Sequence, residues 1–429
     1  MKILLLGSGG REHALAWKMA GSPFCSALYI APGNPGAARE GTCVSLAPDD
    51  FSGVAEFVRR EGIEMVVVGP EAPLVAGLAD YFAEQPDLSE VCFIGPGAEG
   101  AQLEGSKDFA KRFMQRHGIP TAAYRTFSAA ELESGLQHLA KANLPIVLKA
   151  DGLAAGKGVL ICEEREEAFS AFRQMLEGQF GEASRKVVVE EFLAGREFSV
   201  FVLTNGRHYC LLPTAKDHKR IGEGDTGLNT GGMGAISPPP FVDEELMAKV
   251  EKRIIQPTIR GLQAEGIPYL GFIFFGLIEV DGEPYVIEYN CRLGDPETQA
   301  ILPRLDEDLV ALMREAAAGS GRFAADAPEK CVAEISPQAA ATIVLASGGY
   351  PEHYEKGFPI SGLEKVQDAL VFQAGTSLKD GQLLTAGGRV LAVTGLGKDM
   401  AEALQKARAG AEAIEFEGRY FRRDIGLGV

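Results

Sequence analysis

The first hundred residues contain four short apolar runs, each followed or closed by a glycine or a proline. Segments long enough to form a helix separate Lys2–Gly7, Ala27–Ala31, Met65–Gly69 and Val91–Gly95. This alternation predicts an open parallel α/β sheet, because parallel strands need a crossover helix between them. Ligands of such sheets bind at the carboxyl ends of the strands. We therefore expect a ligand site formed by Gly7–His13, Ala31–Gly36, Val68–Leu74 and Ile94–Pro96.

Size and charge narrow the class of protein. A chain of 429 residues has room for about three domains. Its net charge of −17 disfavours binding to nucleic acid or an anionic membrane. The seven cysteines are scattered without a C-x-x-C pair, which fits a reducing compartment, and the apolar N-terminal run is too short for a signal peptide or a membrane span. We expect a cytoplasmic protein, most simply a monomer.

The glycine-rich turn after the first run resembles a dinucleotide motif but lacks its third glycine. Gly7 and Gly9 permit a tight turn into a helix whose N-terminus attracts phosphate, whereas Glu12 stands where the third glycine belongs. No acidic residue follows the second run to bind a ribose. A smaller phosphorylated ligand is favoured over a dinucleotide, and a turn that needs glycine only for its geometry is the alternative.

A second glycine-rich loop, Asp151–Val159, differs from a Walker A loop because Gly158 replaces the Ser or Thr that holds magnesium. Between two strands it can act as a flap that offers backbone N–H groups and Lys157 to phosphates. Lys149 ends the apolar strand Pro145–Ala150. A lysine in such a strand needs an anionic partner unless its end reaches solvent.

Two further strands carry polar groups. Val187–Leu193 is apolar apart from Glu190 and Glu191, and it suits either an adenine slot, with Glu197 at the ribose, or an exposed sheet edge. In Tyr285–Gln299, Glu288 and Asn290 share one face of a strand and offer the hard oxygen ligands that magnesium prefers.

The residues that follow this strand are also polar. Arg292 suits a carboxylate or a phosphate. Asp295 and Glu297 open the next helix, where they either cap it or serve the site.

The segment Leu212–Pro240 is rich in Gly and Pro and has no periodicity, so we expect a long functional loop. In it, Asp217 is a candidate for binding a substrate ammonium, and Lys219 and Arg220 for binding phosphate. His218 is interpreted as a surface histidine on a mobile loop. A hairpin with an Asp-Gly turn is predicted for Gly271–Tyr289, and the last unit, from about Ala325, ends in a helix at Met400–Ile414.

Read together, these segments resemble the ATP-grasp superfamily, and more closely the phosphoribosylamine–glycine ligases. The resemblance rests on nine stretches in the same order. They are G-G-R-E-H-A-L-A-W-K, A-P-G-N, V-G-P-E-A-P-L, A-Q-L-E-G-S-K, K-A-D-G-L-A-A-G-K-G-V, D-H-K-R, N-T-G-G-M-G-A, N-C-R-L-G-D-P-E-T-Q and G-G-R-V-L-A-V-T. Departures include Leu228, Leu293 and Ser8, and Gly276 stands where the wider superfamily has a second acidic metal ligand.

The resemblance implies a multidomain α/β and α+β fold. It has an N-terminal open parallel α/β sheet (pre-ATP-grasp, residues 1–104), an ATP-grasp core (105–325) with an inserted lid (about 122–188), and a small C-terminal α+β domain (326–429). It also implies the ATP-dependent joining of glycine to 5-phosphoribosylamine through glycyl phosphate, in purine synthesis. The alternatives are another ATP-grasp ligase or carboxylase, or a nucleotide-binding module without turnover.

The resemblance further assigns residues to ATP, to magnesium or manganese, and to the two substrates. Those implied for the nucleotide are Lys107, Lys149, Lys157, Glu190, Glu191, Leu193 and Glu197. Those implied for the metal are Glu288 and Asn290. Gly9, Gly10, Asn34 and Glu71 are implied to face phosphoribosylamine. Asp217, Arg292 and Asp295 are implied to lie nearest the reacting glycine, and Lys219 is counted with them as a catalytic residue.

Overall fold

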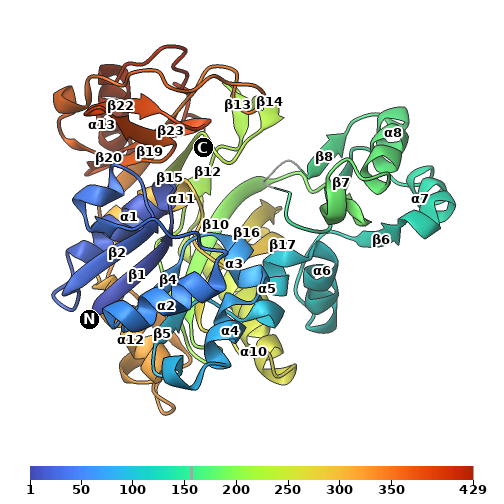
Figure 1. Ribbon diagram of the computed structural model, residues 1–429. Coiled ribbons are helices and arrows are strands. Elements are labelled where there is room, and N and C mark those ends of the chain that lie inside the picture. The colour runs from blue at the N-terminus through green and yellow to red at the C-terminus, as the bar shows by residue number, and fades with distance from the viewer. Residues whose placement is uncertain (155–157, 429) are drawn as a thin grey trace.

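The computed structural model describes residues 1–154 and 158–428. Its N-terminal region is a parallel sheet, as predicted, and it has five strands in the order β3-β2-β1-β4-β5 (Figure 1). The strands are β1 (Lys2–Gly7), β2 (Ala27–Pro32), β3 (Thr42–Cys43), β4 (Met65–Val68) and β5 (Cys92–Ile94). The helices are α1 (Gly10–Ala20), α2 (Phe51–Glu61), α3 (Glu71–Val75), α4 (Leu78–Ala83) and α5 (Ala98–Gly105). Strand β3 was not predicted, because two residues carry no pattern.

The central sheet carries the polar strand identified in the sequence and has the order β17-β16-β10-β11-β18. Its strands are β10 (Arg196–Thr204), β11 (Tyr209–Leu211), β16 (Gly271–Val280), β17 (Glu283–Asn290) and β18 (Lys330–Val332). The predicted β16–β17 hairpin is confirmed, with positive φ at both Asp281 and Gly282. The helices of this region are α6 (Lys107–Arg116), α9 (Glu244–Val250), α10 (Gln256–Ala264), α11 (Glu297–Ile301) and α12 (Leu309–Ala318).

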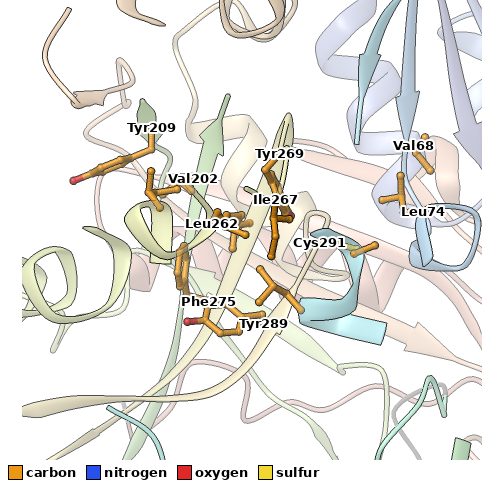
Figure 2. Packing of buried hydrophobic residues seen from close by; sticks show 14 of the residues in the cluster. Val68, Leu74, Val202, Tyr209, Leu262, Ile267, Tyr269, Phe275, Tyr289 and Cys291 are labelled. Atoms are coloured by element: carbon orange, nitrogen blue, oxygen red, sulfur yellow. The ribbon is translucent and has the colours of Figure 1, made fainter. Parts of the chain in front are cut away.

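One hydrophobic core joins the N-terminal and central sheets. Figure 2 shows Val68 and Leu74, from β4 and α3, in the same cluster as Tyr269, Phe275 and Tyr289 of the central region. Alternate residues of β1 enter this cluster and a second one on the opposite face of the sheet. Both faces of the N-terminal sheet are therefore buried, as expected when helices cover a parallel sheet.

The lid extends from the body as a four-stranded sheet in the order β6-β9-β7-β8 with two helices (Figure 1). Its elements are β6 (Tyr124–Ser128), α7 (Leu132–Leu139), β7 (Ile146–Ala150), β8 (Val159–Cys162), α8 (Arg165–Leu176) and β9 (Lys186–Glu191). It has a hydrophobic core of its own, which includes Phe127, Leu148 and Phe172. Ser128 and Glu131 form a capping box that opens a short 3-10 turn before α7.

The expectation of an irregular loop over residues 212–240 was wrong, because four short strands lie within it. They are β12 (Lys216–Asp217), β13 (Arg220–Gly222), β14 (Thr226–Asn229) and β15 (Gly234–Ser237). Strands β13 and β14 form a hairpin, while β12 and β15 join the C-terminal sheet β12-β15-β19-β23-β20. Runs of two to four residues rich in glycine show no periodicity, and the partner of β15 is β19, far along the chain.

The C-terminal region completes that sheet and covers it with one long helix. Its elements are β19 (Ala339–Ala346), β20 (Ala369–Gln373), β21 (Thr376–Lys379), β22 (Gln382–Thr385), β23 (Arg389–Gly397) and α13 (Met400–Ala413). The Asp399 side chain caps α13 by accepting from the backbone N–H of Glu402. Across the described residues, no helix combines the length and apolar character needed to cross a membrane.

Candidate functional site

The turn after β1 is closed by Glu12, the residue that stands where the dinucleotide motif would have its third glycine. Glu12 accepts from the backbone N–H of Gly9 at 2.6 Å and from Arg11 Nε at 2.6 Å. A side chain at Gly7 or Gly69 would collide with it, so these glycines make the slot that Glu12 fills. The N-terminus of α1 thus receives a negative charge from its own chain. This arrangement argues against a dinucleotide pyrophosphate at the turn, in agreement with the sequence.

Gly9 and Gly10 bring the N-terminal turn against α11. A Cβ atom on Gly10 would lie 2.5 Å from Gln299 Nε2, and one on Gly9 would lie 3.4 Å from Asp295 Oδ2. Gln299 in turn donates to Asp295 Oδ1 at 2.8 Å. The two glycines and Asp295, which were assigned to different substrates, are therefore neighbours.

Asn34 lies in the same region, but its amide is used by the protein. Its Nδ2 donates to Ser8 O and Gln373 O, both at 2.8 Å, and its Oδ1 accepts from the N–H groups of Gly36 and Ala37. His13 Nδ1 accepts from Gln373 N–H at 2.7 Å, and burial and the nearby Arg39 lower its pKa to about 4. Asn34 and His13 therefore fasten the end of β20 to the N-terminal sheet.

Arg292 lies just after β17, between two carboxylates. Its Nη2 is 2.7 Å from Glu104 Oε1, and its Nε is 3.3 Å from Glu71 Oε2. Glu104, on α5, also accepts from the backbone N–H of Cys291 at 2.8 Å. Burial opposes ionisation of Glu71, but Arg292 and Arg11 nevertheless lower its pKa. Arg292 and Glu71, which were assigned to different substrates, therefore meet at the carboxyl ends of the N-terminal strands.

A buried cluster of one carboxylate and two lysines joins the lid to the body. Glu190 Oε2 lies 3.0 Å from the Nζ atoms of both Lys149 and Lys111, and Lys149 Nζ donates to Ile287 O of β17 at 3.1 Å. The other oxygen, Glu190 Oε1, is buried without a hydrogen-bond partner. A buried acceptor without a donor marks a place for a ligand donor, such as an exocyclic amine.

Other residues predicted for the nucleotide surround this cluster. Lys107, at the first position of α6, donates to Gly152 O at 3.2 Å, and burial and the Lys149 charge lower its pKa, while Glu288 opposes that change. Leu193 lies half-buried between β9 and β10. Glu191 is exposed and accepts from the N–H of Ala123 at 2.8 Å, which ties its carboxylate to the lid. The predicted Lys157 lies outside the described residues.

Lys219 is the centre of a second cluster, formed by three carboxylates. Its Nζ is 3.1 Å from Glu197 Oε2 and 3.9 Å from Glu288 Oε1. Burial alone would lower the pKa of Lys219, but Glu197, Asp217 and Glu288 raise it well above its ordinary value. Burial raises the pKa of Asp217, and Glu197 and Glu288 add to that rise against the opposing Lys219. Lys219 therefore stays charged in a strongly acidic surrounding.

Glu288 and Asn290 point to one face of β17, as predicted, and their donors suit a hard cation. Burial opposes the charge on Glu288, but Lys219, Lys149 and two further cations lower its pKa. Asn290 Nδ2 is buried without a partner. Within residues 1–154 and 158–428, no group of three or more His, Cys, Asp and Glu side chains is arranged to hold a metal ion. The protein thus offers two adjacent oxygen donors, which fits an ion that takes its other ligands from phosphates and water.

Gly276 explains why the neighbouring strand carries no second acid. It pairs with Glu288 across β16 and β17, next to a β-bulge. A Cβ atom on Gly276 would lie 2.9 Å from Glu288 Cγ. The missing side chain makes room for the carboxylate of Glu288.

The sequence left open whether Asp295 caps the helix α11 or serves the site. The structure shows that Asp295 does not cap α11. No side chain caps this helix, and Asp295 Oδ2 is 3.4 Å from Arg389 Nη2 of β23. Arg389 Nη1 also donates to Asp295 O at 2.7 Å and Gly231 O at 2.6 Å. Glu297 does lie in the first turn of α11, and burial together with the neighbouring Asp217 raises its pKa to about 8.

The interpretation of His218 as a surface histidine was wrong. His218 is buried, its Nε2 accepts from Gly426 N–H at 3.2 Å, and burial, Lys216 and Arg422 lower its pKa to about 4. The chain terminus covers it: Arg422 is bound to Asp225 and Asp424, each at 2.7 Å, and donates to Arg220 O. Contacts between segments two hundred residues apart gave no local signal.

Four side chains of this region were not identified from the sequence, because each lies in an ordinary helical or strand pattern. Lys111 lies on helix α6 and Glu104 on helix α5. The helical pattern of each segment accounts for these residues, so nothing in the sequence marks them as part of a site. Gln299 belongs to α11, and Arg389 opens β23. For Lys111 and Glu104, burial of a charged residue is the signal, and it becomes visible only in three dimensions.

Comparison with known proteins identifies the family. Residues 1–104, 105–298 and 340–428 match the models described as the N domain, the ATP-grasp (A) domain and the C domain of phosphoribosylglycinamide synthetase. The chain is 50% identical to a phosphoribosylamine–glycine ligase of Allochromatium vinosum, over 99% of this chain and 98% of that protein. It is 48% identical to that of Pseudomonas aeruginosa, over 99% and 97%.

A solved structure agrees with these matches. The crystal structure of phosphoribosylamine–glycine ligase from Thermotoga maritima has a TM-score of 0.85 and 37% identity, over 99% of this chain and all of that one. The predicted fold class and the predicted resemblance are both confirmed. The chain therefore belongs to the phosphoribosylamine–glycine ligase family, which is built on the ATP-grasp fold.

Proposed function

We propose that this chain joins the carboxyl group of glycine to the amine of 5-phosphoribosylamine at the expense of ATP. The products are glycinamide ribonucleotide, ADP and phosphate, in purine synthesis. The observation that carries the proposal is a group of cations next to Glu288. Lys219 Nζ lies 3.9 Å from Glu288 Oε1, and Lys149 Nζ donates to the carbonyl of the adjacent Ile287. Lys107 and Arg292 contribute to the lowered pKa of the same carboxylate. A cluster of four cations around one acid is suited to gathering phosphate oxygens next to a metal ion.

The chemistry requires activation of a poor leaving group. A carboxylate oxygen does not leave when an amine attacks at neutral pH, whereas the phosphate of an acyl phosphate does. Transfer of the γ-phosphoryl group of ATP to glycine gives glycyl phosphate, and the sugar amine then attacks its acyl carbon. The protein contributes positioning, charge neutralisation and exclusion of water from an intermediate that water would hydrolyse.

The nucleotide is assigned to the junction of the lid and the central sheet. We propose that Lys107 and Lys149, with Lys157, hold the phosphates, and that the unpartnered Oε1 of Glu190 accepts from the adenine amine. Glu191 and Leu193 would line the ring, and Glu197, now bound to Lys219, would turn to the ribose hydroxyls. The lid has its own core, so it can close over the nucleotide as a unit.

Magnesium or manganese would be held by Glu288 and Asn290, whose two donors fit an ion shared with phosphate oxygens. When bound, the ion neutralises the negative charge of the phosphates. Lys219 remains protonated beside it and balances the charges of Glu197, Asp217 and Glu288.

The substrates are assigned to the carboxyl ends of the N-terminal strands. Gly9, Gly10 and Glu71 would face phosphoribosylamine, and Asn34, whose amide is fully hydrogen-bonded, would shape that pocket rather than bind directly. Arg292 would bind the carboxylate of glycine, with Asp217 at its ammonium and Asp295 near the reacting groups.

We further propose domain limits at 104/105 and 325/326, with the lid at about 122–188. Matches to three family models support the general division. We propose a cytoplasmic monomer. The net charge of −17 supports the further proposal that it has no nucleic-acid or membrane partners.

The test is an assay of ADP release with each substrate omitted in turn. Release that depends on both glycine and phosphoribosylamine supports the proposal, whereas bicarbonate-dependent release indicates a carboxylase. Glu288→Ala and Lys149→Ala should each abolish product, and Glu283→Ala, at the far end of the same strand, should not. Full activity in both site variants would reject the site, and tight ATP binding without turnover in the unmodified chain would reject the function.

A further inference from the structure

Two cysteines outside the site face each other across neighbouring strands. Cys210 of β11 and Cys331 of β18 are direct partners in a parallel register. Both contact the same hydrophobic cluster, so their side chains lie on the same face of the sheet. Adjacent strands are about 4.8 Å apart, which lies within the range of roughly 4.4–6.8 Å that Cα atoms span in disulfides.

The surroundings give the two thiols different chemistry. The neighbouring Cys210 thiol lowers the pKa of Cys331 despite its burial, and the Arg322 guanidinium lowers it further, while Glu307 and Glu315 oppose. The Cys331 thiol, together with burial, raises the pKa of Cys210. Arg322 is fixed by two hydrogen bonds to Glu307, of 2.6 and 2.9 Å. The lowered pKa favours Cys331 over Cys210 as the attacking thiolate.

The fold makes the nucleophile accessible from solvent. Strand β18 is the edge of the central sheet, and its residues Lys330 and Val332 are exposed. Cys331 is half-buried, whereas Cys210 is buried. A small oxidant entering from the sheet edge therefore reaches Cys331 before Cys210.

We propose that Cys210 and Cys331 form a modification site, a dithiol that a peroxide converts to an intramolecular disulfide. The Cys331 sulfur attacks one peroxide oxygen, which keeps its own hydrogen, and the O–O bond breaks. The other oxygen leaves as water, with its own hydrogen and the proton of Cys331. The resulting sulfenic acid is attacked by the Cys210 sulfur, so an S–S bond forms, the S–O bond breaks, and a second water leaves with the Cys210 proton. Two thiols are oxidised, one peroxide is reduced, and no other reactant is needed.

Such a bridge would connect a segment that leads into the site to a segment that leads into the C-terminal sheet. Strand β11 directly precedes the segment that carries Asp217 and Lys219, and β18 directly precedes the connection to β19. The disulfide would join these two points covalently at the edge of the central sheet, where three residue pairs now hold them together.

The experiment treats the full chain with hydrogen peroxide, blocks the remaining thiols by alkylation and maps peptides by mass spectrometry. The expected result is a cross-linked peptide pair containing Cys210 and Cys331, the loss of two thiols per chain and their recovery with dithiothreitol. Cys331→Ser should lose the cross-link and leave Cys210 open to alkylation after denaturation. Cys43→Ser, which removes a half-buried cysteine paired with no other thiol, should retain the cross-link.

Three results would overturn the proposal. The first is complete alkylation of both cysteines in peroxide-treated protein under conditions that oxidise other thiols of the chain. The second is sulfinic acid at Cys331 without a bridge. The third is a disulfide that links either residue to a different cysteine. Peptide mapping of the unmodified sequence gives these answers even if a variant does not fold.

Discussion

Replacing Lys111 by methionine should change how stability depends on pH. Lys111 is buried, and its Nζ contacts Glu190 Oε2 at 3.0 Å and Thr121 Oγ1 at 2.8 Å. Burial lowers its pKa from 10.5 to about 8, against the opposing charge of Glu190. A lysine with a lowered pKa binds fewer protons in the folded state than in the unfolded one. It therefore reduces stability at neutral pH, and this cost disappears as pH rises from about 8 to 10.5.

The size of the effect follows from these two pKa values. One pKa unit corresponds to about 1.36 kcal/mol, so the cost is about 3 kcal/mol near pH 7.5 and about 1.4 kcal/mol near pH 9.5. Lys111→Met removes the titrating group. The free energy of unfolding of the unmodified protein minus that of the variant should therefore rise by about 2 kcal/mol between these pH values.

The assay is urea unfolding followed by circular dichroism at several pH values for the two proteins and for Lys141→Met, which replaces an exposed lysine. The control should give a difference that does not vary with pH. A flat or falling difference for Lys111→Met would refute the idea that burial, rather than the pair with Glu190, dominates the titration of Lys111.

Three further substitutions test the packing around the site. Gly276→Ala should displace Glu288, because the new Cβ would lie 2.9 Å from Glu288 Cγ. We expect kcat, measured by ADP release, to fall about 100-fold, and the free energy of unfolding, measured in urea, to fall by about 1–3 kcal/mol. Phe172→Ala should remove about 3–5 kcal/mol from the separate lid core and produce an early unfolding transition in calorimetry. Arg422→Gln should lower stability by about 1–3 kcal/mol, because the buried arginine loses its ion pairs with Asp424 and the exposed Asp225, and proteolysis should then cut the β13–β14 hairpin faster.

Each of these expectations has a contrary outcome. Full activity of Gly276→Ala would show that Glu288 has room to move without loss of function. A single unfolding transition in Phe172→Ala would mean that the lid and the body unfold together. Unchanged proteolysis of the hairpin in Arg422→Gln would mean that contacts other than Arg422 hold it.

The sequence predicted the parts of the fold that are locally encoded. The strand at Lys2–Gly7 was predicted with its observed bounds, because an apolar run that ends at glycine depends on neighbours in the chain alone. The Asp281-Gly282 turn was predicted for the same reason. Strand β15 was missed because what makes it a strand is its pairing with β19, and four residues of Gly-Ala-Ile-Ser contain no sign of that partner.

The residues of the candidate site also fall into those that local sequence could predict and those that it could not. Glu288 and Asn290 could be paired from the sequence, because a strand puts alternate residues on one face. The ion pairs Lys111–Glu190 and Arg292–Glu104 could not be predicted from the sequence, because each pair joins two separate elements. His218 was misread since its cover comes from the chain terminus, at Gly426.

The hydrophobic core shared by the N-terminal and central sheets has a consequence for dividing this protein. A fragment that ends near residue 104 would be cut off from the central part of the hydrophobic cluster to which Val68 and Leu74 belong, and would expose apolar side chains of that cluster to water. Expressed alone, the fragment should aggregate, and the rest of the chain should not fold correctly without it. The lid has a hydrophobic core of its own, so it is the part of the chain that can be exchanged or removed without exposing the core of the body.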